Sequence, residues 1–186
     1  MRIVSGKFKG RPIATPKGRG TRPTADRTRE ALFNILAHAE WSPAIDGARV
    51  VDLFAGSGGL GLEAMSRGAA FCLFVETDSA ARGAIRTNVE ALQLTGATRV
   101  HRRSATSLGN IPPNIGGAFD FAFLDPPYHK GLAEPCLTEL SNGDRLSTDA
   151  IAVVETGSNE TPEFTGWKSL DTRNYGAARV AFLKQI

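Results

Sequence analysis

The sequence is poor in cysteine and contains no long apolar run. Its two cysteines, Cys72 and Cys136, lie far apart and form no CxxC pair, so we expect buried, reduced thiols and no structural zinc site. His38 and His101 lack metal-ligand spacing, and no metal is expected. No stretch approaches the ~20 apolar residues that span a bilayer, and the first residues lack the apolar core of a secretory signal. We therefore expect a cytoplasmic protein without a membrane segment.

Positive charge is concentrated at the N-terminus. The formal net charge is only +3, but residues 1–30 contain nine Lys and Arg against two acids, which leaves the other 156 residues with a net charge of −4. Such an uneven distribution of charge favours contact with a polyanion, above all nucleic acid, over a merely solvated basic segment. Phe8 lies between two lysines, where it could stack on a nucleotide or close a hairpin. The residues expected to bind nucleic acid are Lys7, Phe8, Lys9, Arg11, Arg22 and Arg27.

Short apolar runs alternate with helical patterns from residue 49 onward, in what we interpret as a single domain over residues 1–186. Strands are predicted at 49–54, 71–76, 99–103, 119–124, 151–155, 167–173 and 179–184. Helices are predicted from Thr24 or Asp26 and at 58–67, 79–94 and 134–140, and residues 1–22 are predicted to form a basic hairpin, over 2–14, and a loop. This alternation predicts a doubly wound α/β sheet. Ligands bind such sheets at the carboxyl ends of the strands, here just after residues 54, 76, 103 and 124.

A glycine-rich loop follows the first predicted strand. Residues 52–61 read Asp-Leu-Phe-Ala-Gly-Ser-Gly-Gly-Leu-Gly, and Glu76 ends the second strand twenty residues after Gly56. Glycines let the backbone approach a ligand closely, and an acid at that distance can accept hydrogen bonds from ribose hydroxyls. The loop also fits the GxGxxG pattern of dinucleotide sites, so by itself it leaves a nicotinamide enzyme open. The short chain and the next motif disfavour that alternative.

The fourth predicted strand ends in Asp125, Pro126, Pro127 and Tyr128, which are the candidate catalytic residues. The prolines stiffen the loop and leave its carbonyls free of competing backbone donors. Asp125 and a loop carbonyl can each accept one N–H bond of a conjugated amine, which favours a pyramidal nitrogen with its lone pair aimed at an incoming methyl group. Tyr128 can stack on an unstacked base. Orientation of this kind removes several kcal/mol from a barrier.

Together the glycine loop, Glu76 and the Asp-Pro-Pro-Tyr motif resemble class I S-adenosylmethionine methyltransferases. More narrowly, the chain resembles the RsmD family, bacterial 16S ribosomal RNA guanine-N2 methyltransferases. The narrower resemblance rests on residues 1–6, Met-Arg-Ile-Val-Ser-Gly, on Lys-Gly-Arg at 9–11, and on residues 21–34, which begin Thr-Arg-Pro-Thr-Ala-Asp-Arg-Thr-Arg-Glu. It extends over nearly the whole chain.

The resemblance implies a Rossmann-like, seven-stranded, mostly parallel sheet whose last strand is antiparallel, with a small N-terminal β-hairpin. It implies that Glu76 holds the ribose of S-adenosylmethionine, that residues 125–128 present the target amine, and that the hairpin faces RNA in a small ribosomal subunit or assembly intermediate. Ser104 stands where the family commonly has an acid near the adenine, so the Ala105 amide is expected to carry more of that contact. The cofactor-binding candidates are Asp52, Phe54, Ala55, Gly56, Ser57, Gly58, Glu76, Thr77, Ser104, Ala105 and Asp125. A monomer is expected.

Other functions remain open at this point. An adenine-N6 nucleic-acid methyltransferase uses the same motif, although such enzymes usually carry an additional target-recognition domain. A protein glutamine methyltransferase would favour Asn at position 125. A non-catalytic RNA-binding ribosome-assembly factor could keep the same fold, but an intact Asp125 and glycine loop count against it.

Overall fold

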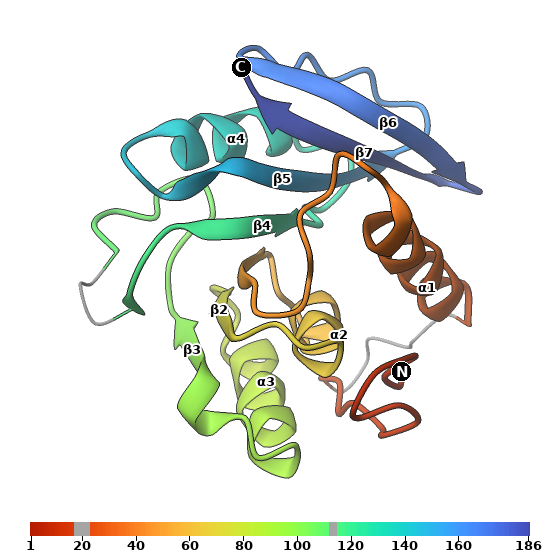
Figure 1. Ribbon diagram of the computed structural model, residues 1–186, viewed down its shortest axis with the longest axis vertical. Coiled ribbons are helices and arrows are strands. Elements are labelled where there is room, and N and C mark those ends of the chain that lie inside the picture. The colour runs from red at the N-terminus through yellow and green to blue at the C-terminus, as the bar shows by residue number, and fades with distance from the viewer. Residues whose placement is uncertain (17–22, 112–114) are drawn as a thin grey trace.

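Seven strands form one mixed sheet in the order β3-β2-β1-β4-β5-β7-β6 (Figure 1). The computed structural model describes residues 1–16, 23–111 and 115–186. Strands β1 to β5 run parallel, whereas β7 is antiparallel to both of its neighbours, β5 and β6. The predicted antiparallel last strand is therefore confirmed. The strands are β1 (Arg49–Leu53), β2 (Phe71–Val75), β3 (Thr98–His101), β4 (Phe119–Leu124), β5 (Leu146–Gly157), β6 (Trp167–Tyr175) and β7 (Ala178–Gln185).

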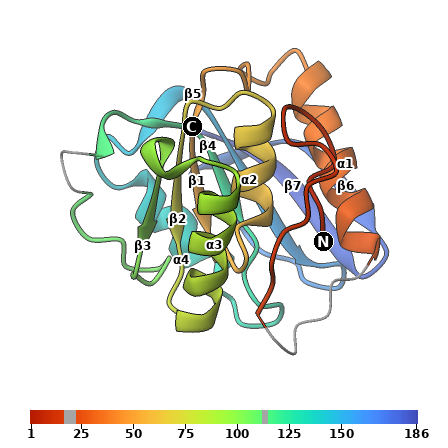
Figure 2. The ribbon, with the colours of Figure 1, turned by 90° about the horizontal axis from the view of Figure 1, so that it is seen from below.

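Helices cover both faces of the sheet, as Figure 2 shows. On one face lie α1 (Pro23–His38), α2 (Gly59–Ser66) and α3 (Ser79–Ala91), and on the other lies α4 (Ala133–Ser141); a short 3-10 helix, η1 (Thr95–Ala97), precedes β3. Side chains alternate along each strand, so Val50 packs in the core under α1 to α3 and Val51 in the core under α4. Strands buried on both faces must be apolar almost throughout, which explains their uniformly hydrophobic sequences.

Close packing of α2 against β2 depends on Gly61. A Cβ at this position would lie 2.4 Å from Cε1 of Phe74 and 2.5 Å from Sγ of Cys72. Only glycine therefore lets the first turn of α2 approach the sheet so closely. Both cysteines, Cys72 and Cys136, are buried and free, as predicted.

The predicted hairpin over residues 2–14 forms only in part. Its two arms are joined by one antiparallel bridge, between Arg2 and Pro12, and by backbone hydrogen bonds from Ile3 N to Arg11 O at 3.0 Å and from Gly10 N to Ile3 O at 2.8 Å, but they form no regular pair of strands. The intervening backbone donors bind α2 instead: Val4 N and Ser5 N donate to Glu63 at 2.8 and 3.0 Å, and Lys7 N donates to Ser66 O at 2.7 Å. These N–H groups are therefore unavailable for a longer ladder, and the middle of the segment is anchored on α2.

Glu63 is the centre of this anchor. Its side chain is fully buried, and besides the two amides it accepts a hydrogen bond from Nε of Arg67 at 2.9 Å. Nε of Arg29, on α1, lies 3.5 Å from the same carboxylate. A buried carboxylate is tolerated only when donors and opposite charges surround it, as they do here. Glu63 thus ties the N-terminal segment, α1 and α2 together.

Several element boundaries differ from the prediction. Strand β3 ends at His101, two residues earlier than predicted, and β5 begins at Leu146 because that residue pairs with Phe119 beyond an irregularity in the ladder. Helix α3 ends at Ala91, and Gln93 follows in the left-handed region, with φ of 58°. In the part of the chain that the structure describes, no helix has the length and apolarity needed to cross a membrane.

Candidate active site

The ends of β1, β2 and β4 bring the two predicted motifs to one edge of the sheet. Leu53 is paired in register with Val75 of β2 and with Leu124 of β4. The next residue on each strand, Phe54, Glu76 or Asp125, therefore starts a loop at the same level. The structure thus places the glycine loop beside both Glu76 and the Asp-Pro-Pro-Tyr loop, as the sequence predicted.

The glycine loop has a backbone that few sequences can adopt. Phe54, Gly56 and Gly58 all have positive φ values, of 60°, 56° and 85°. Two glycines adopt this conformation without steric cost, whereas Phe54 carries strain of order 1–3 kcal/mol. The loop is closed by hydrogen bonds from Gly58 N to Ala55 O at 2.7 Å and from Ala55 N to Val75 O at 3.2 Å. It leads directly into the free amides at the start of α2.

Glu76 shapes this loop from the neighbouring strand. Its carboxylate accepts hydrogen bonds from Gly56 N at 2.8 Å and from Asp78 N at 2.9 Å. Each carboxylate oxygen has two lone pairs, so both can still accept a ligand hydroxyl. Thr77, the next residue, is exposed at the same rim.

Asp52 and Ser57 lie beneath the loop. Asp52 is 1% exposed and accepts a hydrogen bond from Gly61 N at 2.8 Å. Burial raises the pKa of the Asp52 carboxyl well above its usual value, although the Gly61 N–H partly offsets this. Ser57 is also buried, and its carbonyl accepts from Nδ2 of Asn88 at 3.0 Å. Both residues therefore support the loop from the core side.

The Asp125 carboxylate has no hydrogen-bond donor among the residues that the structure describes, and no cation pairs with it there. Asp125 is exposed at the end of β4, yet the surrounding protein atoms desolvate its side chain. This desolvation, followed by the nearby charge of Glu155, raises the pKa of Asp125 to about 7. Both carboxylate oxygens of Asp125 are therefore available to accept hydrogen bonds from a ligand.

Tyr128 is held by Glu155, a residue at the carboxyl end of β5 that the sequence analysis did not single out. The Tyr128 hydroxyl donates a short hydrogen bond to Oε1 of Glu155. Partial burial raises the pKa of Tyr128, and the hydrogen bond to Glu155 adds to the rise. Burial also raises the pKa of Glu155, against the lowering effect of the same hydrogen bond. No sequence motif includes Glu155. It lies near the Asp-Pro-Pro-Tyr loop because β5 pairs with β4 in this register.

Glu160 fixes the residue that follows the motif. Its carboxylate accepts hydrogen bonds from His129 N at 3.1 Å and from Gly157 N. His129 has φ of 59°, a left-handed conformation that is costly for a residue with a Cβ. The loop after β5 therefore holds the end of the Asp-Pro-Pro-Tyr loop in a strained geometry. Glu160 was likewise not predicted.

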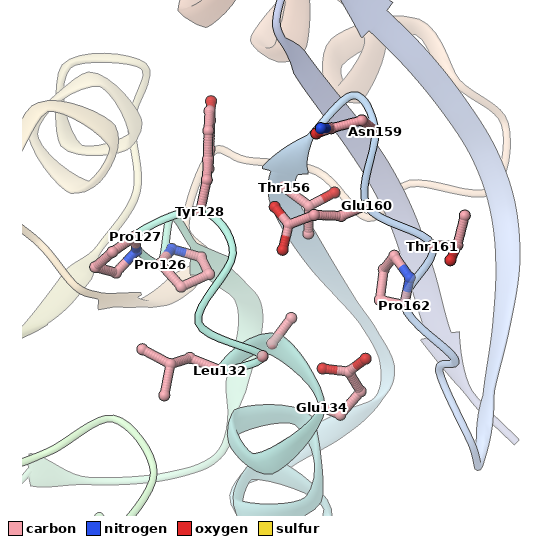
Figure 3. Close-up of a pocket in the computed structure, with 12 residues that line it drawn as sticks. Pro126, Pro127, Tyr128, Leu132, Glu134, Thr156, Asn159, Glu160, Thr161 and Pro162 are labelled. Atoms are coloured by element: carbon pink, nitrogen blue, oxygen red, sulfur yellow. The ribbon is translucent and has the colours of Figure 1, made fainter.

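A hollow of about 330 Å³ opens between these two loops. Pro126, Pro127 and Tyr128 lie on one side of it, and Thr156, Asn159 and Glu160 lie on the other, as Figure 3 shows. Leu132 and Glu134, at the start of α4, line its floor. The volume is at the lower end of the range for small-ligand sites.

The predicted adenine-side residues lie in the loop after β3. Ser104 is exposed, and its hydroxyl is hydrogen bonded to that of Thr106 at 2.8 Å. Ala105 is buried in the core under α4. Within the described ranges, no group of three or more His, Cys, Asp or Glu residues could hold a metal ion.

The basic residues proposed to contact nucleic acid are arranged on the anchored N-terminal segment and on α1. Lys7 and Lys9 are exposed, and Nζ of Lys7 lies 5.3 Å from the ring centroid of Phe8, which is half-buried against the core. Arg11 is exposed, and its guanidinium donates to Ala91 O at 2.9 Å. Arg27 is exposed on α1. Arg22 lies outside the described residues.

Comparison with known sequences shows relatives across the whole chain. The family described as conserved hypothetical protein 95 matches residues 1–184. The Bacillus subtilis protein YlbH, named as a candidate rRNA methyltransferase, is 37% identical over 187 residues, which cover 100% of this chain and 99% of YlbH. The Escherichia coli ribosomal RNA small subunit methyltransferase D is 38% identical over 157 residues, which cover 83% of this chain and 74% of that protein.

Solved structures agree with this relationship. The Escherichia coli protein yhhF, described as a candidate methyltransferase, has a TM-score of 0.82 at 34% identity and covers 100% of this chain and 97% of its own. Magnesium protoporphyrin IX methyltransferase from Synechocystis, solved with bound S-adenosylmethionine, shares the fold at 13% identity, with a TM-score of 0.64 over 91% of this chain and 87% of its own. The chain therefore belongs to the RsmD family of S-adenosylmethionine-dependent methyltransferases, the family described as conserved hypothetical protein 95.

Proposed function

We propose that the chain transfers a methyl group from S-adenosylmethionine to the exocyclic N2 amine of a guanine in 16S ribosomal RNA. The observation that carries this proposal is the Asp125 carboxylate, which has no donor among the described residues and lies in a proline-stiffened loop beside the glycine loop. An acceptor kept free in this way suits an amine that must arrive with N–H groups to donate. The relatives named as ribosomal RNA methyltransferases supply the class of substrate.

The residues of the site fit S-adenosylmethionine. When bound, the cofactor supplies an electrophilic methyl group on a positively charged sulfonium. The carboxylates of Glu76, Asp125 and Glu155 gather near the strand ends, and none of them forms an ion pair within the described part of the chain. Their negative charge complements a cation, and the left-handed glycine loop leaves room for a close backbone approach.

Three residues of the Asp-Pro-Pro-Tyr loop, called the catalytic loop from here on, contact the target base in this proposal. Asp125 accepts one N–H of the target amine and the Pro126 carbonyl accepts the other, so that the nitrogen lone pair is directed at the methyl group. Tyr128 stacks on the base, which must leave its helix to reach the loop. Methylation would make the amine nitrogen acidic, and Asp125 or water would take up the proton that it loses. No separate strong base is required.

The exposed basic residues Lys7, Lys9 and Arg27 serve RNA binding in this proposal. Contacts of lysine and arginine with phosphates position an RNA without reading its sequence. Because Glu63 fixes the N-terminal segment on α2, these charges have a defined position relative to the glycine loop. The substrate would be a small ribosomal subunit or an assembly intermediate.

The proposal is tested by the Asp125→Ala variant. We expect methyl transfer from radiolabelled cofactor to small-subunit RNA to fall by at least about 100-fold, far more than the cofactor dissociation constant rises, because the loss of orientation outweighs the loss of one of three nearby negative charges. Persistent transfer would contradict the catalytic role of Asp125. Mass spectrometry of ribosomal RNA from a strain that lacks the protein identifies the base: a missing N2-methylguanosine supports the proposal, and a missing N6-methyladenosine overturns it.

A further inference from the structure

Two carboxylates stand side by side where the target base must bind. Leu124 of β4 and Val154 of β5 are paired in register on parallel strands, so Asp125 and Glu155 are the next residues on two neighbouring strands, which lie about 4.8 Å apart. Leu124 and Val154 both point into the core under α4, and successive side chains alternate. The charge of Glu155 accordingly acts on Asp125.

Glu155 is only partly occupied by its protein partner. Its Oε1 accepts the Tyr128 hydroxyl, whereas its Oε2 has no donor, and no arginine or lysine pairs with it, within the described ranges of the chain. The residue is half-buried and Thr156 after it is buried. Within the described residues, Glu155 therefore presents one free acceptor oxygen near the free carboxylate of Asp125.

Guanine is the purine whose edge fits two adjacent acceptors. It carries the N1–H donor directly beside the N2 amine, whereas adenine has a lone pair at N1 beside its N6 amine. A carboxylate next to Asp125 can accept the N1–H of guanine, but it would face the N1 lone pair of adenine with like charge. A site built to accept a particular N–H rejects analogues that lack it, because its own acceptor is then left unpaired.

We propose that Glu155 is the residue that selects guanine, by accepting the N1–H of the base whose N2 amine is bound by Asp125. This inference rests on the proposed function. It gives Tyr128 a second task, since its hydroxyl occupies Oε1 of Glu155 and leaves Oε2 for the base.

The test compares two bases that share the N2 amine and differ at N1 and at C6, where only guanine has a carbonyl. Small-subunit RNA is ligated from fragments that carry either guanosine or 2-aminopurine riboside at the methylated position, and is reconstituted into particles. 2-Aminopurine keeps the amine but has a lone pair at N1. We expect wild-type protein to favour guanosine by at least about 100-fold in kcat/KM, and Glu155→Gln to reduce this ratio by about 10- to 100-fold, because the amide can donate to N1.

Asp149→Asn is the matched control, a carboxylate-to-amide change on the same strand at an exposed position that pairs with Lys184. It should leave the ratio unchanged. Cofactor calorimetry on Glu155→Gln checks that the site is still folded, and Glu155→Asp, which keeps the charge, should retain a preference for guanosine. An unchanged ratio in a folded Glu155→Gln protein overturns the inference alone. Absence of N2-methylguanosine in the wild-type reaction overturns the proposed function itself.

Discussion

Glu76 accepts a hydrogen bond from the backbone N–H of Gly56 at 2.8 Å, and so the acid that ends β2 fixes the glycine loop that follows β1. The sequence analysis assigned Glu76 only to the ribose of the cofactor. In the structure the same carboxylate also holds Asp78 N, at the start of α3. One side chain thus shapes the loop while it remains able to accept ribose hydroxyls.

Replacement of Glu76 by alanine should weaken cofactor binding by about 10- to 100-fold, since hydrogen bonds to a charged group are worth about 1.5–3 kcal/mol each. Isothermal titration calorimetry with S-adenosylmethionine measures the effect. Glu90→Ala, at an exposed position of α3, is the control and should bind normally. An unchanged dissociation constant for Glu76→Ala would remove this residue from the cofactor site.

Methyl transfer should depend on pH through Asp125. Desolvation and the charge of Glu155 raise the pKa of Asp125 from its ordinary value to about 7, so its carboxyl is protonated below that pH in the free enzyme. Only the ionised form has both oxygens free to accept the amine. We therefore expect kcat/KM, which reports the free enzyme, to fall as pH drops below about 7 and to level off above it.

Removal of the Glu155 charge tests the cause of this pH dependence. Glu155→Gln removes one of the two causes of the raised pKa of Asp125, so the rise in kcat/KM should move to lower pH. RNA binding measured over the same range separates this effect from changes in substrate affinity. A flat profile between pH 5.5 and 8 would show that Asp125 does not titrate in this range.

Glu160 should matter for turnover and not for cofactor affinity. Its carboxylate holds His129 N at 3.1 Å while His129 stays at a positive φ of 59°. Glu160→Ala removes this support, and we expect kcat to fall by about tenfold as the catalytic loop relaxes, roughly the effect of losing 1.4 kcal/mol of positioning. Single-turnover kinetics measure the rate of methyl transfer, and calorimetry measures the affinity for the cofactor.

A second substitution tests whether backbone strain at His129 causes the lower rate. Glycine adopts a left-handed conformation without steric cost, so His129→Gly in the Glu160→Ala background should recover part of the lost rate. His129→Gly alone should leave the free energy of unfolding nearly unchanged. If the double variant is no faster than Glu160→Ala, backbone strain at His129 is not what Glu160 opposes.

Charge reversal at Lys7 and Lys9 should weaken RNA binding and reduce its salt dependence. Both side chains are exposed on the anchored N-terminal segment. Each lost phosphate contact lowers the slope of log K against log salt by about 0.7–0.9, so the double Lys→Glu variant should show a slope smaller by about 1.5 or more. Lys168→Glu, exposed on β6, is the control. An identical slope would place the segment outside the interface.

The sequence predicted the sheet well because buried parallel strands leave a simple signal. The run from Phe119 to Leu124 is apolar except at Asp120 and is followed by prolines, and the structure gives it the same limits, β4 (Phe119–Leu124). The glycine loop and Asp125 were found for a similar reason, since each follows a strand directly and belongs to a contiguous motif.

What the sequence did not reveal depends on contacts between distant segments. The hairpin expected over residues 2–14 is limited to one bridge and a few backbone hydrogen bonds, because other amide groups of the segment bind Glu63 and Ser66 of α2, which lie about 60 residues later. Glu155 and Glu160 are isolated acids whose roles depend on the register of β5 against β4 and on the loop that follows it. No local spacing encodes that register.

The burial of Glu63 makes the first residues of the chain inseparable from the catalytic domain. A protein shortened by its first five residues would lose the amides of Val4 and Ser5 and leave part of a buried carboxylate unsatisfied, at a cost of about 1–3 kcal/mol for each missing partner. Because α2 begins at the glycine loop, that damage would spread to the cofactor side. A different RNA-binding sequence could replace this segment only if it also supplied hydrogen-bond donors to the Glu63 carboxylate.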